Sequence, residues 1–195
     1  MGTVQEITAA VTLGLTPDLR VDGYKKSGTR FHSVGQESIR VLSVQSSRWN
    51  TRTEGRLTIN LGVHFAALHQ LAEAIPFKGL PKEYDCEVRI RIGELMPARQ
   101  DYWWTVGTDT KADVLAGELR DAWKKYARLW LEHNSHLSNA AAELENRGQY
   151  FMAAAAQLLL GRRENAEELT RLALRDYPHA ASRTRDWAQK HDLSI

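Results

Sequence analysis

Two arginines that alternate with apolar residues are the side chains in this sequence best suited to chemistry. Arg89 and Arg91 alternate with Val88 and Ile90 within the segment 87–92. A β-strand with this period turns one set of side chains toward a core and the other set away from it. Because a guanidinium group can bind a carboxylate or phosphate through two parallel hydrogen bonds, the spacing predicts a surface that holds an anion or an acidic protein partner.

A second alternating segment, 55–63, extends this surface. Its residues Leu57 and Ile59 are apolar, whereas Thr58 and Asn60 between them are polar. The segment 39–45 joins the same sheet in either register, and with Leu42 and Val44 directed inward it adds Gln45 to the polar side. The predicted polar face therefore comprises Gln45, Thr58, Asn60, Arg89 and Arg91. The alternative is a solvated sheet face on which Arg89 or Arg91 pairs with Glu87 or another carboxylate.

Three tryptophans lie near these segments. Trp49 follows Arg48 in a turn, and we expect it to fold back over the core, although an exposed Trp beside arginines would instead be a contact site for a protein or a base. Trp103 and Trp104 are adjacent, so on a strand one enters the core while the other lies outside. Trp103 is therefore the second aromatic candidate for the binding surface.

The sequence predicts no metal site and no cofactor. His133 and His136 could place two imidazoles on one helical turn, but no third ligand follows at a matching distance, and histidine is also favoured near a helix C-terminus without a metal. His64 and His69 are five residues apart, a spacing that does not align on a helix. Cys86 is expected to be a small buried thiol.

Catalytic signatures are absent from the sequence. It contains no phosphate-binding loop, no GxGxxG after a strand, no GxSxG and no HExxH. We therefore expect no catalytic residue. A net charge of only +2 argues against a nucleic-acid-binding protein, which usually carries a strong basic excess.

Composition also indicates whether the protein contains disulfides, where it is located and whether it enters a membrane. The single cysteine excludes an internal disulfide framework. The longest apolar run, 151–160, is far shorter than the roughly 20 residues of a membrane-spanning helix, and the N-terminus does not resemble a signal peptide. We expect a soluble, cytoplasmic protein that does not enter a membrane.

The order of elements indicates an α+β fold in two parts. Residues 1–136 combine helical spacing at 4–15, 65–75 and 110–135 with strand-like segments between them. This predicts a mainly antiparallel, curved sheet with helices on one face. Residues 137–195 form an all-helical C-terminal tail, a helical hairpin of tetratricopeptide style plus flanking helices. Its helices are expected at 140–146, 150–160, 164–177 and 182–191.

Several segments in the first part resemble a known family. In chain order they read GYKK at 23–26, VQSSRWN at 44–50, LTINLGV at 57–63, CEVRIRIG at 86–93 and WW at 103–104. Together they resemble the bacterial family of domain of unknown function 4304, over roughly residues 4–137. The resemblance implies the extent of the domain and a bacterial source, and it transfers no activity and no catalytic residue.

These features predict a non-catalytic binding module that contacts a protein partner through the polar face. The alternative is a small enzyme, or a binder of small anionic molecules, that uses Arg89, Arg91 and Asn60. A third interpretation, single-stranded nucleic acid binding, requires Trp49 or Trp103 to be exposed beside a basic track.

Overall fold

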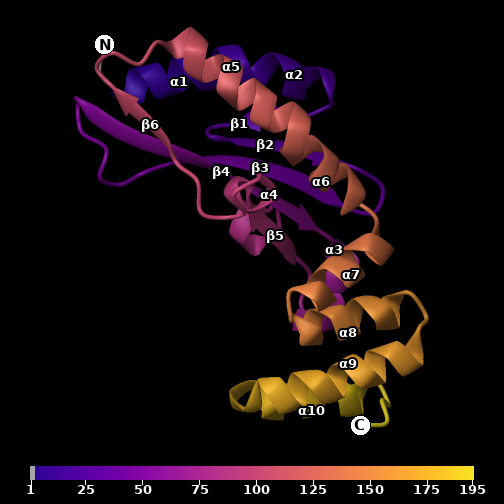
Figure 1. The fold of residues 1–195 in the computed structure, drawn as a ribbon. Helices are drawn as coiled ribbons and strands as arrows, with labels where there is room; N and C mark the ends of the chain where they lie inside the picture. The colour runs from indigo at the N-terminus through magenta and orange to yellow at the C-terminus, as the bar shows by residue number, and fades with distance from the viewer. Residues whose placement is uncertain (1–2) are drawn as a thin grey trace.

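The computed structural model describes residues 3–195 and has the expected α+β architecture: a six-stranded antiparallel sheet with helices on one face, followed by C-terminal helices (Figure 1). The strands are β1 (Lys25–Ser27), β2 (Arg30–Val34), β3 (Ile39–Ser46), β4 (Glu54–His64), β5 (Val88–Arg91) and β6 (Trp104–Gly107). The helices before the tail are α1 (Thr3–Gly14), α2 (Thr16–Val21), α3 (Ala66–Glu73), α4 (Ile92–Leu95), α5 (Ala112–Ala122) and α6 (Arg128–His133).

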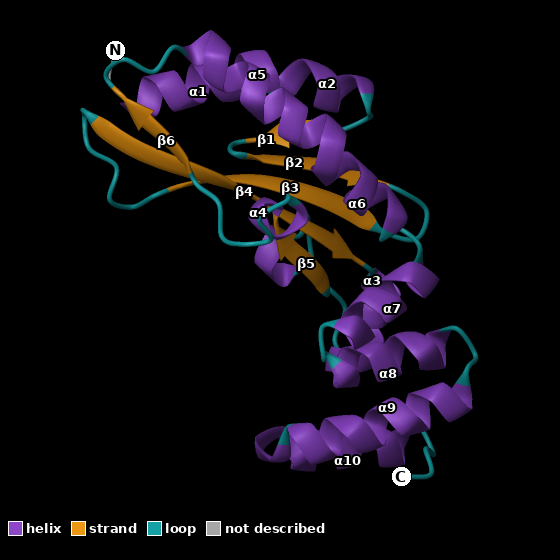
Figure 2. Ribbon diagram, viewed as in Figure 1, coloured by secondary structure: helices purple, strands orange, loops and turns teal. Residues whose placement is uncertain are grey.

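Strand β4 is the centre of the sheet. The strands lie in the order β1-β2-β3-β4-β5, and β6 also pairs with β4. Along one edge β4 pairs with β3 over most of its length, and along the other edge it pairs first with β6 and then with β5. The two short strands β5 and β6 thus share one edge of β4 (Figure 2).

The alternation of β4 places one set of its side chains in the core. Its residues Leu57, Ile59, Leu61 and Val63 are fully buried in the same hydrophobic cluster as side chains from α1, α2 and α5. These helices lie over one side of the sheet (Figure 2). Helix formation and sheet pairing therefore bury a common apolar layer, as period-two and period-3.6 patterns require.

The helix that crosses the sheet contains a wider turn. Helix α5 continues through a π-helical stretch, η2 (Trp123–Ala127), into α6. Trp123 is fully buried, and its indole N–H donates to Asp22 at 3.1 Å. The Thr110 hydroxyl accepts from the Gly107 backbone N–H at 2.8 Å, and helix α5 begins without a side-chain cap.

The other face of the sheet is partly covered by the segment 76–87. The His32 ring lies 2.8 Å from the Pro81 carbonyl oxygen, and Arg30 pairs with Glu83 in the short helix η1 (Glu83–Asp85) at 3.6 Å. Cys86 packs directly on β4 at Gly62, where an added Cβ atom would lie 2.6 Å from the Cys86 sulfur. The polar face is consequently open over only part of its area.

The C-terminal helices dock on α3. They are α7 (Leu137–Asn146), α8 (Tyr150–Leu159), α9 (Arg163–Asp176) and α10 (Ala181–Lys190), close to the ranges expected from the sequence. The Trp187 indole N–H donates to the Leu71 carbonyl at 3.0 Å, its ring meets Phe151 edge-on with centroids 5.2 Å apart, and Arg183 pairs with Glu73 at 2.7 Å. Apolar packing and polar contacts both hold the tail against α3.

Replacing Gly62 by Ala is expected to destabilise the protein. The new methyl group would clash with the Cys86 side chain and approach the Glu83 carbonyl at 3.1 Å, and overpacking of this kind costs about 1–3 kcal/mol. Chemical denaturation monitored by circular dichroism measures the change. The matched control is Gly117→Ala in α5, where no neighbouring atom lies within 4 Å and the substitution should stabilise by about 0.5–1 kcal/mol. Equal stability of the two variants would contradict the packing described here.

Replacing Trp187 by Ala is expected to release the tail. The change removes a buried aromatic side chain and its bond to Leu71, and such truncations cost about 3–5 kcal/mol. Limited proteolysis should then cut within 137–195 and spare the sheet domain. The control is Trp49→Ala, because Trp49 is 77% exposed and a surface change alters stability by about 0.5 kcal/mol or less. Protection of the tail in the Trp187 variant would contradict the docking.

Candidate functional site

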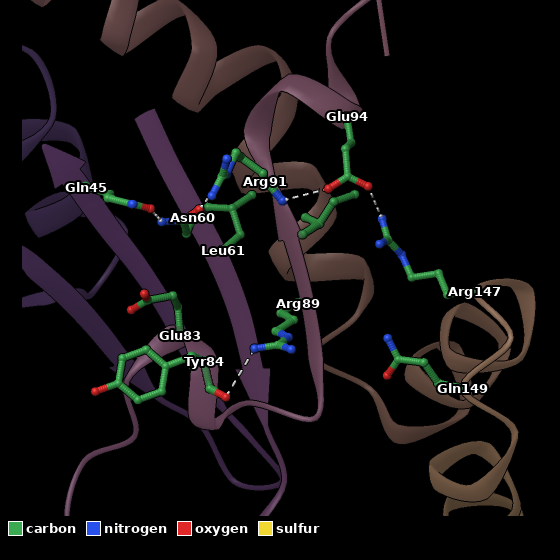
Figure 3. Close-up of a pocket in the computed structure, with 11 residues that line it drawn as sticks. Gln45, Asn60, Leu61, Glu83, Tyr84, Arg89, Arg91, Glu94, Arg147 and Gln149 are labelled. Atoms are coloured by element: carbon green, nitrogen blue, oxygen red, sulfur yellow. Dashed lines mark hydrogen bonds and ion pairs between the residues drawn. The ribbon is translucent and has the colours of Figure 1, made fainter. Parts of the chain in front are cut away.

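A polar cleft of about 420 Å³ lies on the polar face (Figure 3). One wall is formed by strands β3, β4 and β5, through Gln45, Asn60, Arg89 and Arg91. Tyr84 and its neighbour Glu83 in η1 form a second wall, and Arg147 and Gln149 from the turn between α7 and α8 form a third. We call this hollow the Arg89 cleft.

Strand register brings the predicted residues together. Asn60 pairs with Ser43 on one side and with Arg91 on the other, and Gly62 pairs with Arg89. Val88 and Ile90 are buried in the core cluster. The predicted orientation of the arginines, away from the core and beside Asn60, is therefore confirmed.

Arg91 is held in place by a chain of hydrogen bonds. Its Nε donates to the Asn60 amide oxygen at 3.1 Å, and the Asn60 amide in turn donates to Gln45 at 2.8 Å. The Arg91 Nη1 donates to the Asp101 carboxylate at 2.8 Å. The hydrogen bond from Arg91, together with a second from the Trp103 indole at 2.9 Å, lowers the pKa of the Asp101 carboxyl below its usual value.

Trp103 completes this arrangement. The Arg91 guanidinium lies 5.4 Å from the centre of the Trp103 ring, within the range of a cation–π contact. Trp104 is buried and pairs with Leu57 on the core side, so the adjacent tryptophans separate as predicted. With its charge paired and its plane stacked, Arg91 is a rigid part of the wall.

The acidic side chains of the cleft also have partners. Glu83 pairs with Arg30. Glu94 accepts from Arg147 at 3.1 Å through one oxygen and from the Arg91 backbone N–H at 3.2 Å through the other. Arg147 additionally pairs with Glu143 at 2.7 Å. Both carboxylates that line the cleft thus have a cationic partner, and Glu94 shares its partner with Glu143.

Arg89 differs from the other two arginines of the cleft. Among the described residues, its polar contact is one hydrogen bond to the Tyr84 backbone carbonyl, which is long at 3.4 Å, and the residue is exposed. Tyr84 beside it is 53% exposed, and the Gln149 side chain extends into the cleft from the α7–α8 turn (Figure 3). An anion that enters the cleft would find the Arg89 guanidinium available for a bidentate contact.

Two of the predicted binding residues lie elsewhere. Thr58 is on the polar face opposite Gln45, but it is fully buried. Trp49 is exposed rather than folded over the core, so the expected lid is wrong. Its ring lies 5.1 Å from the Arg48 guanidinium, and neither residue lines the Arg89 cleft. Trp49 projects because the turn between β3 and β4 carries it beyond the sheet.

Glu87 does not lie where the alternation predicted it. It was expected to point outward, where the solvated-face alternative paired it with an arginine, but it is buried and contacts His64 at 3.1 Å and His69 at 3.3 Å. In the part of the chain that the structure describes, these three residues bring potential metal ligands within 4.8 Å of one another, and His133 and His136 belong to no such group. The pairing of Val63 with Val88 is the signal that places His64 beside Glu87.

Cys86 is buried, as expected. Burial raises the pKa of its thiol well above the usual value, and the nearby carboxylates of Glu87, Asp85 and Glu83 act in the same direction. The thiol donates to the Lys82 carbonyl at 3.3 Å. Cys86 therefore serves the packing of the 76–87 segment on Gly62.

The fold and the site define an α+β sheet protein with a polar, arginine-lined cleft. The family described as a domain of unknown function, DUF4304, matches residues 15–133, and the chain belongs to this family. No curated protein matches the chain, and no solved structure does. Within the described residues, no helix has the length and apolar character needed to cross a membrane.

Replacing Thr58 by Val is expected to stabilise the protein by about 1 kcal/mol. The Thr58 hydroxyl is buried without a hydrogen-bond partner among the described residues, and a buried unsatisfied group costs about 1–3 kcal/mol. Urea denaturation measures the effect. The control is Thr170→Val, because the equally buried Thr170 hydroxyl donates to Ala166 and its loss should destabilise. A less stable Thr58 variant would contradict this assignment.

Proposed function

We propose that this chain is a non-catalytic binding module whose Arg89 cleft receives an acidic group of a protein partner. Arg89 is the cation that contacts the acidic group. Arg91 and Asn60 form a fixed polar wall beside it, and Tyr84 offers an exposed aromatic surface at the rim.

The observation that carries the proposal is that Arg89, unlike the other charged residues that line the cleft, is in no ion pair among the described residues. Glu83 is paired with Arg30, Glu94 with Arg147, and Arg91 with Asp101. After these pairings the charge that lacks a carboxylate partner in the cleft is that of Arg89. A partner that supplies a carboxylate or phosphate would give Arg89 an ion-pair partner as well. Two charge-assisted hydrogen bonds to one guanidinium are strong and directional.

The residue types around Arg89 also favour a protein partner. Arginine and tyrosine are enriched where proteins meet, and they account for many of the contacts that dominate binding energy. The Tyr84 ring is exposed, and its backbone carbonyl already orients the Arg89 guanidinium. The cationic and aromatic groups of the site therefore lie next to each other at the surface.

A second candidate is a small anionic molecule. The volume of the cleft, about 420 Å³, lies within the range of roughly 300–1,000 Å³ typical of small-molecule sites. Arg147 and Gln149 add polar groups from a third direction, which suits a compact ligand such as a dicarboxylate. The two candidates share Arg89 and differ in how much surface outside the cleft the ligand would contact.

The source of the protein, its location in the cell and the form of its C-terminal helices belong to the same proposal. We infer a bacterial, cytoplasmic protein whose C-terminal helices form a tetratricopeptide-style hairpin with flanking helices. The alanine-rich contact between α8 and its neighbours, in which residues 153–156 are fully buried, supports the close helix packing of such a hairpin.

Replacing Arg89 by Ala is expected to weaken partner binding by about thirtyfold or more. Loss of a central interfacial arginine typically costs at least about 2 kcal/mol, which corresponds to that factor in affinity. Proteins captured from a host lysate by the wild type would be identified, purified and measured by calorimetry with each variant. A hexaglutamate peptide, succinate and inorganic phosphate serve as defined probes that separate the two candidates.

The matched control is Arg20→Ala, because Arg20 is an exposed arginine of α2 on the helix-covered side of the sheet. It should leave every affinity unchanged, and both variants should keep the wild-type circular dichroism spectrum and melting temperature. If the Arg89 variant binds the purified partner and all three probes as tightly as the wild type does, the Arg89 cleft is not the binding site.

A further inference from the structure

A second polar cluster lies on the same sheet face, at the end of β4 away from Thr58. His64 is the last residue of β4, Glu87 directly precedes β5, and His69 lies in α3. The Val63–Val88 pair sets His64 beside Glu87. The turn from β4 into α3 then brings His69 back over the same carboxylate, which is why a spacing of five residues converges here although it would not on a single helix.

The geometry of this cluster matches the ligand set of a metal ion. The Nδ1 atoms of His64 and His69 lie 3.1 and 3.3 Å from the same oxygen, Oε1 of Glu87. In a tetrahedral zinc site with bonds of about 2.0–2.1 Å, neighbouring ligand atoms are about 3.3 Å apart. All three candidate ligand atoms lie within 4.8 Å of one another, so one ion between them requires side-chain movements of about 1 Å.

The carboxylate is positioned for this role by the backbone. The Phe65 N–H donates to the other oxygen, Oε2 of Glu87, at 2.9 Å, which fixes the group and leaves Oε1 directed at the two imidazoles. Hydrogen bonds of this kind from outside the ligand set commonly orient ligating carboxylates. The end of β4, the start of α3 and the residue before β5 thus supply the three side chains of the cluster.

Burial makes the charge of the cluster important. The side chains of Glu87 and His64 are only 1% and 2% exposed, and buried charges in proteins are paired or coordinate metals. A divalent cation held at Oε1 would place a positive charge directly beside the Glu87 carboxylate. The Phe77 ring covers both imidazoles, 4.6 Å from His64 and 5.3 Å from His69.

We propose that His64, His69 and Glu87 form a binding site for a divalent transition-metal ion, and that Zn²⁺ is the ion that fits best. Two imidazole nitrogens and one carboxylate oxygen are a donor set that zinc accepts readily, with a fourth position for water. The His69 side chain is 17% exposed, so this side of the site gives the ion access. This site replaces the sequence-based expectation that the protein has no metal.

Zinc binding by the full-length protein tests the proposal. After treatment with a chelator and its removal, calorimetry should show one Zn²⁺ bound per chain, with a raised melting temperature because zinc binds the folded state. Co²⁺ should give the visible absorption of a tetrahedral complex. Glu87→Gln, which keeps the shape of the side chain, and His69→Ala, at the more exposed ligand, should each weaken Zn²⁺ binding by more than about 100-fold.

The control is the double variant His133→Ala/His136→Ala, which removes two histidines outside the cluster and should bind Zn²⁺ as the wild type does. Circular dichroism establishes that each variant is folded before titration. The proposal is overturned if the wild type shows no saturable uptake of Zn²⁺, or if Glu87→Gln and His69→Ala, both folded, bind it unchanged. Loss of binding only in the control variant would also overturn it.

Discussion

Backbone pairing along β4 positions the hydrophobic core, the Arg89 cleft and the histidine cluster. Strand β3 occupies one edge of β4, and β6 and β5 share the other edge in succession. Because side chains on a strand alternate between faces, the same eleven residues that anchor the hydrophobic layer also set the positions of Thr58, Asn60, Gly62 and His64 on the opposite face. A slip of one residue would exchange the two sets.

The small size of Gly62 determines what can lie on that opposite face. Cys86 fits against it, and the segment around η1 can therefore cross the sheet in direct contact. The crossing places Tyr84 at the rim of the Arg89 cleft and holds Glu87 at the start of β5, next to His64. The cleft and the histidine cluster consequently both depend on the close approach of the 76–87 segment to β4 at Gly62.

Local pattern predicted the sheet and much of the cleft wall. Alternation in β4 and β5 was sufficient to place Asn60, Arg89 and Arg91 on one face, because the period follows from neighbouring residues alone. Gln45 in β3 could be assigned to either face, and only the pairing of β3 with β4 places it beside Thr58. The contacts that the sequence did not predict involve residues far apart in the chain. Arg147 reaches Glu94 across 53 residues, and no local spacing encodes that meeting.

Other differences depend on how neighbouring segments cover a side chain, which local pattern does not encode. The same alternation that directs Arg89 outward predicted an exposed Glu87, but the chain folds back over that end of the strand and buries it. Trp49 was expected to seek the core on account of its apolar ring, whereas its turn projects beyond the sheet and the ring stacks with Arg48. Burial of a side chain depends on what covers it, which is a property of tertiary structure.

The walls of the Arg89 cleft have separate origins in the chain. The sheet wall and η1 lie within residues 15–133, which match the family, whereas Arg147 and Gln149 belong to the helices that follow. The α7–α8 turn can therefore change in sequence without disturbing the strands that carry Arg89. A substitution at Arg147 or Gln149 would thus reshape one side of the hollow and leave the position of the Arg89 backbone, set by pairing with β4, unchanged.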